Sequence, residues 1–542
     1  MESSLYPTDH SVSAGRATIS PGSIIRAAID FRKAKEYCIV TAAYRSKTLA
    51  VALPMLLLVS GCAVGPDFKS PDAPAVKGYT RGKVPAQTAM AETDGGAAQR
   101  FIEGQDIPAK WWELFHSPAL NSLVKRAIRS NPSLQVAQAA LQEAQENVYA
   151  GEGAFFPNID ANGSAKHQKI SSSQFGRPNG GSYKYSLYNA SVSISYVLDV
   201  FGGERRQLES LEAQRNYQQF QLEAAYLTLT ANVVTTAVKE ASLRAQVAAS
   251  REIIKAESEQ LDVLKQQFAL GAASKNNVLA QQARLAQTKA TLPPLEKQLS
   301  LVRHQLKALA GDFPSEDHGE TFDFSSMQLP QTLPVSLPSK LVEQRPDIRS
   351  AEAQLHQASA QIGVATANMF PKLTLNGDYG TVSTKAGNLF SANTGIWSVG
   401  ANLLQPLIHG GTLLHQRRAA VQAYKKAAAQ YRGTVLTAFQ NVADALRALQ
   451  SDADALKAQT ESLNSASDSL ELSRQQYKVG AISYITLLDA QRTYEQARIS
   501  RVQSQADRYA DTAALFQALG GGWWNRDDVA NVSQADEKAA GQ

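Results

Sequence analysis

The chain has 542 residues, of which 54 are Lys or Arg and 49 are Asp or Glu, so its net charge is only +5. This length excludes a small disulfide-stapled scaffold and suggests about two to four domain-sized units. The weak charge imbalance excludes the strongly basic footprint of a nucleic-acid-binding protein. Cys38 and Cys62 are the only cysteines, too few for a disulfide framework or a four-cysteine zinc site.

The N-terminal part reads as a secretion signal that ends in a lipid-attachment motif. Two basic residues, Arg45 and Lys47, precede an apolar run at 49–59. That run fits the core of a signal peptide and is too short for a membrane-spanning helix of about 20 residues. Val59-Ser60-Gly61-Cys62 follows at once, in the form of a bacterial lipobox. We therefore expect cleavage before Cys62 and covalent lipid on it. The alternative is a chance buried cysteine. Ala63, where Asp would retain a lipoprotein in the inner membrane, favours the outer membrane.

The remainder of the chain is a tandem duplication. Four landmarks recur in the same order, spaced by about 210 residues, which is too long for a solenoid repeat. They pair 131–134 with 345–348, 155–159 with 369–373, 202–203 with 410–411, and 266–274 with 475–483. We expect five parts: an N-terminal extension with the signal peptide (1–61), an acylated linker (62–110), a first repeat (111–325), a second repeat (326–525) and a disordered tail (526–542). Residues 1–44 are either an over-extended gene model or an unusually long start of the signal.

Each repeat is predicted to run helix, β-hairpin, long helix, tip turn, long helix. Pro132 and Pro346 suit the first position of a helix, and the Phe-Pro pairs at 156–157 and 370–371 end it. The segments 204–268 and 412–477 keep a helical pattern, which corresponds to about 100 Å of helix each. Pro293-Pro294 is expected to interrupt the returning helix of the first repeat and to place an elbow there.

Between the helices the pattern changes to strict alternation. Apolar and small polar residues alternate at 190–198, 373–379 and 397–403, and the connections 170–182 and 384–394 are rich in Gly, Ser and Asn. Runs of about ten residues are typical of outer-membrane strands. Four strands cannot close a barrel, so we expect copies of the chain to share one. Two copies would give about 8 strands and three about 12.

The turn between the long helices has the same pattern in both repeats. Gly271 and Gly480 are placed as left-handed C-caps. Ser274 and Ser483 follow three residues later and are predicted to N-cap the returning helices.

Residues 62–525 resemble the TolC-like outer membrane efflux proteins, and more closely their lipoprotein branch, the NodT-type channels of resistance-nodulation-division efflux systems. The motifs that carry the resemblance are Val64-Gly65-Pro66-Asp67-Phe68 after the lipobox, Trp112-Glu113-Leu114-Phe115, Pro118-Ala119-Leu120-Asn121, both Phe-Pro turns, Tyr477-Lys478-Val479-Gly480, Leu487-Leu488-Asp489-Ala490-Gln491-Arg492 and Ala518-Leu519-Gly520-Gly521-Gly522-Trp523. The resemblance implies a mainly α fold with a membrane β-barrel. Long antiparallel helices would form a periplasmic α-barrel, and four β-strands per protomer would contribute to a shared 12-stranded trimeric barrel.

The same resemblance implies a function and partners. The chain would be the outer membrane channel of a tripartite efflux pump, passively conducting drugs or other small toxic solutes. It would be a homotrimer embedded in outer membrane lipid, with a periplasmic adaptor and an inner-membrane pump as partners and no nucleic acid. Neither a metal nor a cofactor is expected, apart from the covalent lipid on Cys62. The sequence does not identify the transported solute, the pump or the adaptor.

The resemblance also implies two functional sites. By position, the periplasmic gate would be formed by Tyr477, Ile485, Asp489 and Arg492. The last three are spaced i, i+4 and i+7, which places them on one face of a helix and, about a three-fold axis, in charged rings. The alternative is a solvated face with one intrahelical ion pair. Asn276-Asn277 stands where some relatives have Thr-Asp, so a second gate layer is left open. The adaptor would dock on the tips Leu270, Gly271, Ala272, Val479, Gly480 and Ala481, which could equally be plain turns.

Other classes of function fit less well. The eight histidines show no metal-ligand spacing, and neither a phosphate-binding loop nor a nucleophile elbow is found, so we expect no enzyme. A structural coiled-coil lipoprotein would not need the alternating strands. A conduit for type I protein secretion stays an alternative within the channels.

Overall fold

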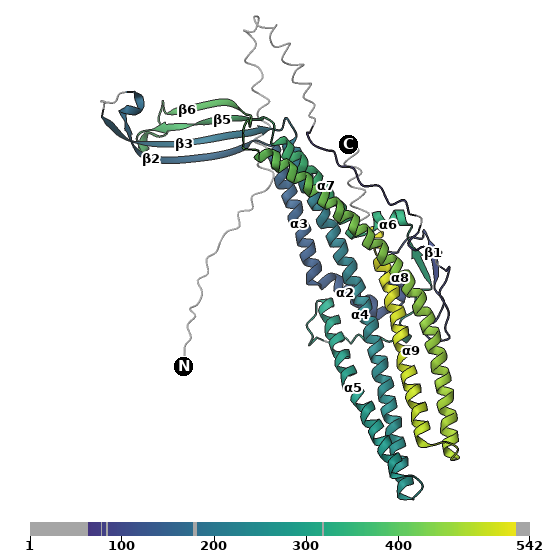
Figure 1. The fold of residues 1–542 in the computed structure, drawn as a ribbon. Coiled ribbons are helices and arrows are strands. Elements are labelled where there is room, and N and C mark those ends of the chain that lie inside the picture. The colour runs from purple at the N-terminus through teal and green to yellow at the C-terminus, as the bar shows by residue number, and fades with distance from the viewer. Residues whose placement is uncertain (1–62, 77, 83–84, 177–180, 317–318, 527–542) are drawn as a thin grey trace, which may run out of the picture. The chain divides into compact units, whose positions relative to one another are not determined.

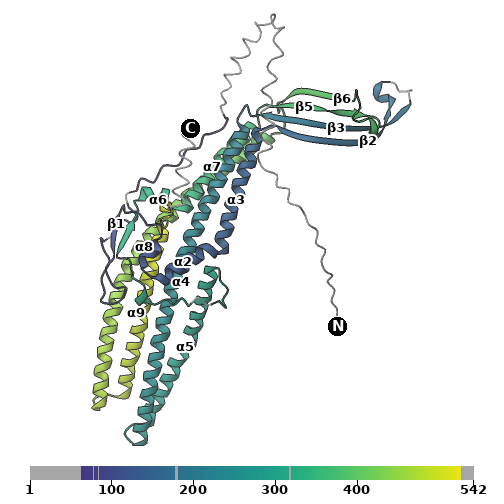
Figure 2. The same ribbon diagram turned by 180° about the vertical axis from the view of Figure 1, so that it is seen from behind.

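The computed structural model describes residues 63–76, 78–82, 85–176, 181–316 and 319–526. Cys62 and the predicted signal lie outside the described residues, and of the predicted tail only Arg526 is described. The described residues all belong to one compact unit. The long helices run side by side, with a β-sheet joined to one end and two helix-turn-helix tips at the other (Figure 1 and Figure 2).

The two halves of the chain contain the same elements in the same order. The first half has α2 Pro118–Ser130, α3 Pro132–Glu152, β2 Asn158–Ser171, β3 Ser182–Leu198, α4 Gly203–Ala269 and α5 Lys275–Ala310. The second has α6 Pro338–Gln344, α7 Pro346–Ala367, β5 Lys372–Ser383, β6 Gly395–Leu404, α8 Thr412–Lys478 and α9 Tyr484–Ala518. Because α4 and α8 have 67 residues each, the predicted duplication extends to the length of the helices.

Proline and a polar cap set the start of the helices that lead into the sheet. Pro132 and Pro346 are the first residues of α3 and α7, where the missing N–H costs no hydrogen bond. In the first half the Asn131 side chain also accepts hydrogen bonds from the Ser133 and Leu134 amides, at 2.9 and 3.3 Å. Arg345 occupies the matching position without a side-chain cap.

The four strands form one antiparallel sheet in the order β2-β3-β5-β6. Apolar residues face one side, where Ile159 pairs with Ile194 and Tyr379 with Trp397. Polar residues face the other side, where Ser398 donates to Asp378 at 3.2 Å. The predicted alternation is therefore confirmed. Strand β3 is longer than expected, since it begins at Ser182. The outer edges of β2 and β6 have no partner strand within the described residues.

The predicted interruption at Pro293-Pro294 was wrong. Helix α5 is continuous through both prolines. The neighbouring Leu292 and Leu295 pack on a small apolar cluster of Leu243, Val247, Leu299 and Val302, which holds the helix on α4. The Thr291 hydroxyl donates to the Thr288 carbonyl at 2.7 Å in the turn before the prolines. Tertiary packing thus outweighs the local preference of proline to break a helix.

The main apolar core lies where short elements wrap the middle of the long helices. It contains the 3-10 turn Trp111–Phe115, and the Trp111 ring stacks on Phe516 of α9 at 5.3 Å. A parallel pair of strands, β1 Arg100–Glu103 and β4 Thr332–Val335, covers it. The segment before β1 is bound to α9 through the buried Arg508, which donates to the Ala97 carbonyl at 2.7 Å. Neither this strand pair nor the docking of the linker was predicted from the sequence.

A cluster of carboxyl groups between α8 and α9 predicts pH-dependent stability. Burial raises the pKa of Asp452 to about 7, a hydrogen bond to Asp511 and the charges of Asp511 and Asp507 act in the same direction, and Arg508 opposes them. Since the folded state favours the protonated form, this group's contribution to stability is present below its unfolded pKa and is lost as pH rises through about 7.

We therefore expect Asp452→Asn to reduce the loss of thermal stability between about pH 5 and pH 8, because the variant carries no charge to desolvate. Circular dichroism melts at both pH values measure this. Asp454→Asn, at an exposed position on the same helix, is the control. An unchanged pH dependence in Asp452→Asn would contradict the assignment.

Candidate functional site

Both helical hairpins end in the same tight turn. Gly271 and Gly480 have φ of 77° and 75°, a left-handed conformation that favours glycine. Ser274 then accepts a hydrogen bond from the Asn277 amide, and Ser483 accepts one from the Thr486 amide, both at 3.2 Å. The serines are the N-caps of α5 and α9.

The side chains on these turns have no covering. Leu270 is 84% exposed and Val479 80% exposed, and the other tip residues (Gly271, Ala272, Gly480 and Ala481) are exposed as well. No atom lies within 4 Å of a Cβ built on Gly271 or Gly480. Each tip therefore presents a small apolar surface with room around its glycine.

Three of the four predicted gate residues lie on one exposed face of α9. Ile485 is 66% exposed, and Asp489 and Arg492 are exposed too. In the described part of the chain, no ion pair joins Asp489 and Arg492. The Asp489 carbonyl accepts a hydrogen bond from the Thr493 hydroxyl at 2.9 Å.

Tyr477 lies differently from the other three. Its ring is half-buried and packs on Tyr484 of α9, with 5.3 Å between ring centroids. Burial raises the pKa of the Tyr477 hydroxyl. The residue holds α8 to α9 near the tip and does not share the exposed face of Asp489.

A buried polar cluster joins the two hairpins above their tips; we call Glu257, Gln281, Arg284, Tyr484 and Glu495 the latch. Arg284 of α5 donates to Glu257 of α4 at 3.0 Å and also to Glu495 of α9. The Tyr484 hydroxyl donates to the Gln281 side chain at 2.6 Å, and Gln281 donates to the Glu257 carbonyl at 2.8 Å.

Most of the latch is buried, and burial strengthens its hydrogen bonds. Gln281 is fully buried, and Glu257 and Glu495 are 3% and 9% exposed. Burial raises the pKa of Tyr484, so its hydroxyl stays protonated and keeps donating. The latch could not be predicted from the sequence, because the bonds that join the two hairpins connect residues 203 and 211 positions apart. The one local signal was a charged or amide residue on an otherwise apolar helix face.

A groove of about 700 Å³ opens beside the latch. Arg284 and Glu495 line it together with Arg492 of the predicted gate face. Its walls come from α4, α5, α8 and α9, so Arg492 of the gate face and two latch residues line one groove between the hairpins.

In the described ranges, no group of three or more His, Cys, Asp or Glu side chains is arranged to hold a metal ion. Of the helices that the structure describes, none combines the length and apolar character needed to cross a membrane.

Comparison with known proteins agrees with this geometry. The family profile of the outer membrane efflux proteins matches residues 123–312 and 337–521, one segment in each half. The pyoverdine export outer membrane protein OpmQ of Pseudomonas aeruginosa is 31% identical over 421 residues, which cover 76% of this chain and 87% of OpmQ. Nodulation protein T of Rhizobium leguminosarum bv. trifolii is 30% identical over 476 residues, covering 86% and 96% of the two chains.

A solved structure shows the same fold. The outer-membrane channel OprN is 27% identical and superposes with a TM-score of 0.75, covering 85% of this chain and all of OprN. The profile match in both halves, the long relatives and the shared fold lead to one conclusion: the chain belongs to the outer membrane efflux protein family.

Proposed function

We propose that three copies of this chain form the outer membrane channel of a tripartite efflux pump. The channel passively conducts drugs or other small toxic solutes through the periplasm and the outer membrane. Outer membrane efflux channels work with an adaptor and an inner-membrane pump. The observation that carries the trimer is the open sheet, whose β2 and β6 edges lack partner strands among the described residues.

The sheet supports a shared barrel in physical terms. Within a bilayer every backbone N–H and C=O needs an internal partner, so an open edge is costly. Four strands per copy give about 12 strands in a trimer, wide enough for a polar lumen. The apolar face with Trp397, 76% exposed, would face lipid, and the face with Asp378 would face water. This amphipathic sheet also argues against a purely structural coiled-coil lipoprotein.

The exposed face of α9 supports a gate. Around a three-fold axis, Ile485 would form an apolar ring and Asp489 an anionic ring beside Arg492. The carboxylate and the guanidinium have no ion-pair partner in the described part of one chain, so each is available to a neighbouring copy. Charged hydrogen bonds between copies would hold the entrance closed.

The latch supports a mechanism for opening. It ties α9 to α4 and α5, so the hairpin that carries the gate face cannot swing freely while Arg284 holds Glu495. Along the helices, the exposed apolar tips lie about one to four turns from the latch residues. We infer that an adaptor docks there and that its contacts compete with the latch.

Covalent lipid on Cys62 is a further part of the proposal. The lipobox before Ala63 supports it, and the fixed position of the segment that starts at Ala63 is consistent with an anchor at this point. The lipid would add a second attachment to the outer membrane beside the strands.

Removal of the anionic ring should open the entrance. We expect Asp489→Ala to raise single-channel conductance in a planar bilayer, because the ring loses its ion pairs with Arg492 of neighbouring copies. Asp468→Ala, which removes an exposed carboxylate from α8, is the matched control and should leave conductance unchanged. Equal conductance of wild type and Asp489→Ala would refute the gate.

Loss of one latch hydrogen bond should loosen the second hairpin. We expect Tyr484→Phe to speed amide hydrogen exchange in the first turns of α9 about fivefold, the effect of one neutral hydrogen bond. Tyr494→Phe is the control, since the Tyr494 hydroxyl has no hydrogen bond in the described contacts. If both variants exchange like wild type, the latch does not restrain α9.

A further inference from the structure

The residues that follow Cys62 lie in a closely fitted recess; we call residues 63–70 the clip. The Val64 amide donates to the Phe201 carbonyl at 3.0 Å, in the connection between β3 and α4. Gly65 has φ of 103°, and a Cβ there would lie 2.5 Å from the Cα of Gly363 in α7. A Cβ on Gly202 would lie 2.5 Å from the Cα of Ala63. The backbone of the clip therefore lies against the backbone of α7 and against the start of α4, at distances that only glycine permits.

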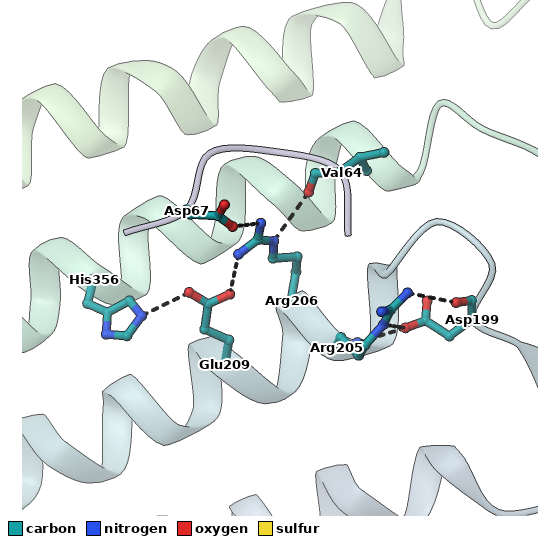
Figure 3. Close-up of polar contacts among 7 residues, drawn as sticks. All are labelled: Val64, Asp67, Asp199, Arg205, Arg206, Glu209 and His356. Atoms are coloured by element: carbon teal, nitrogen blue, oxygen red, sulfur yellow. Dashed lines mark hydrogen bonds and ion pairs between the residues drawn. The ribbon is translucent and has the colours of Figure 1, made fainter. Parts of the chain in front are cut away.

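Arg206 of α4 binds the clip from below with a buried guanidinium (Figure 3). It donates to the Asp67 carboxylate at 2.6 Å and to the Val64 carbonyl at 3.3 Å. A third bond, to Glu209 at 2.7 Å, fixes the guanidinium on its own helix. The Arg206 side chain is 7% exposed, whereas that of Asp67 is 89% exposed. The Arg206 guanidinium is thus buried and preorganised, and it holds a segment that is otherwise exposed.

The clip is also attached to α7, in the second repeat. Phe68 stacks on His356, with 4.3 Å between ring centroids and 11° between ring planes. His356 in turn contacts the Glu209 carboxylate at 2.9 Å (Figure 3). Ser70 donates to Glu352 of the same helix. The clip therefore touches both repeats where their helices lead into the sheet.

The position of the clip matters because Cys62 is bonded to Ala63. Adjacent Cα atoms are about 3.8 Å apart, so acyl chains on Cys62 would start within one residue of the β3–α4 connection. A flexible linker would let the lipid enter the membrane anywhere within its reach. Because the clip is held against α4 and α7, it restricts where the lipid can enter the membrane.

We propose that Arg206 is a positioning residue for the lipid anchor. By holding the clip, it sets the acyl chains of Cys62 beside the strands, so that lipid anchoring and insertion of the sheet into the lipid surface are coupled. This inference rests on the proposed acylation of Cys62, and its test separates failure of the clip from failure of the acylation.

Trypsin measures whether the clip is held. Lys69 is exposed at the end of the clip, and Arg81 is exposed in the following turn as an internal reference. In protein extracted from membranes, we expect Arg206→Met to raise cleavage after Lys69, relative to cleavage after Arg81, about tenfold, because a charged hydrogen bond is lost. Arg126→Met also removes an arginine that bonds two carboxylates, Asp312 and Glu320, and should leave the ratio unchanged. An unchanged ratio in Arg206→Met would overturn the proposal.

The coupling to lipid needs a second measurement. Palmitate should label wild type and not Cys62→Ser; label on the variant would refute the acylation and leave the trypsin result standing. In pulse-chase experiments, Arg206→Met should slow trimer formation in acylated protein about tenfold and add no delay in the Cys62→Ser background. An equal delay in both backgrounds would show a merely structural role and overturn the inference. If Arg206→Met does not accumulate, Gly65→Ala disrupts the clip with Arg206 intact and is read by the same criteria.

Discussion

The unpaired edges of β2 and β6 are the constraint on which the rest of the structure depends. Water can satisfy an open strand edge, and hydrocarbon cannot. A sheet with Tyr379 and Trp397 exposed side by side on one face is suited to lipid only when both edges are paired. One chain cannot do this with the four strands of its sheet. The sheet therefore implies assembly, and assembly places the long helices of several copies around one axis.

The duplication then explains how a gate can form at the far end. Each repeat supplies one hairpin, in which a helix of about 100 Å pairs with a returning helix about half as long. The two hairpins differ in what they expose near the tip. The second carries Ile485, Asp489 and Arg492 on an open face, and the first carries Arg284, which reaches back to Glu495. One hairpin can thus move while the other acts as its support. In the proposed mechanism, the latch between them would set the free energy that an opening partner must supply.

Features of the fold that depend on local sequence patterns could be predicted. Features that depend on contacts between distant residues could not. A glycine followed three residues later by a serine predicted both tip turns, because left-handed backbone and side-chain capping depend on a few adjacent residues. The alternation at 190–198 and 397–403 specified strands for the same reason. The helix break predicted from Pro293 was wrong, because the packing of Leu292 and Leu295 determines the backbone conformation there. Arg206 and Arg284 could not be found from sequence, since their partners Asp67 and Glu495 lie far away along the chain.

We propose that further copies of the same chain close the open sheet. Multi-angle light scattering of the detergent-extracted protein, corrected for bound detergent, tests it most directly. We expect a protein mass of about three chains in the particle, because three sheets give a barrel of about 12 strands. A monomer of 58.4 kDa or less would contradict it.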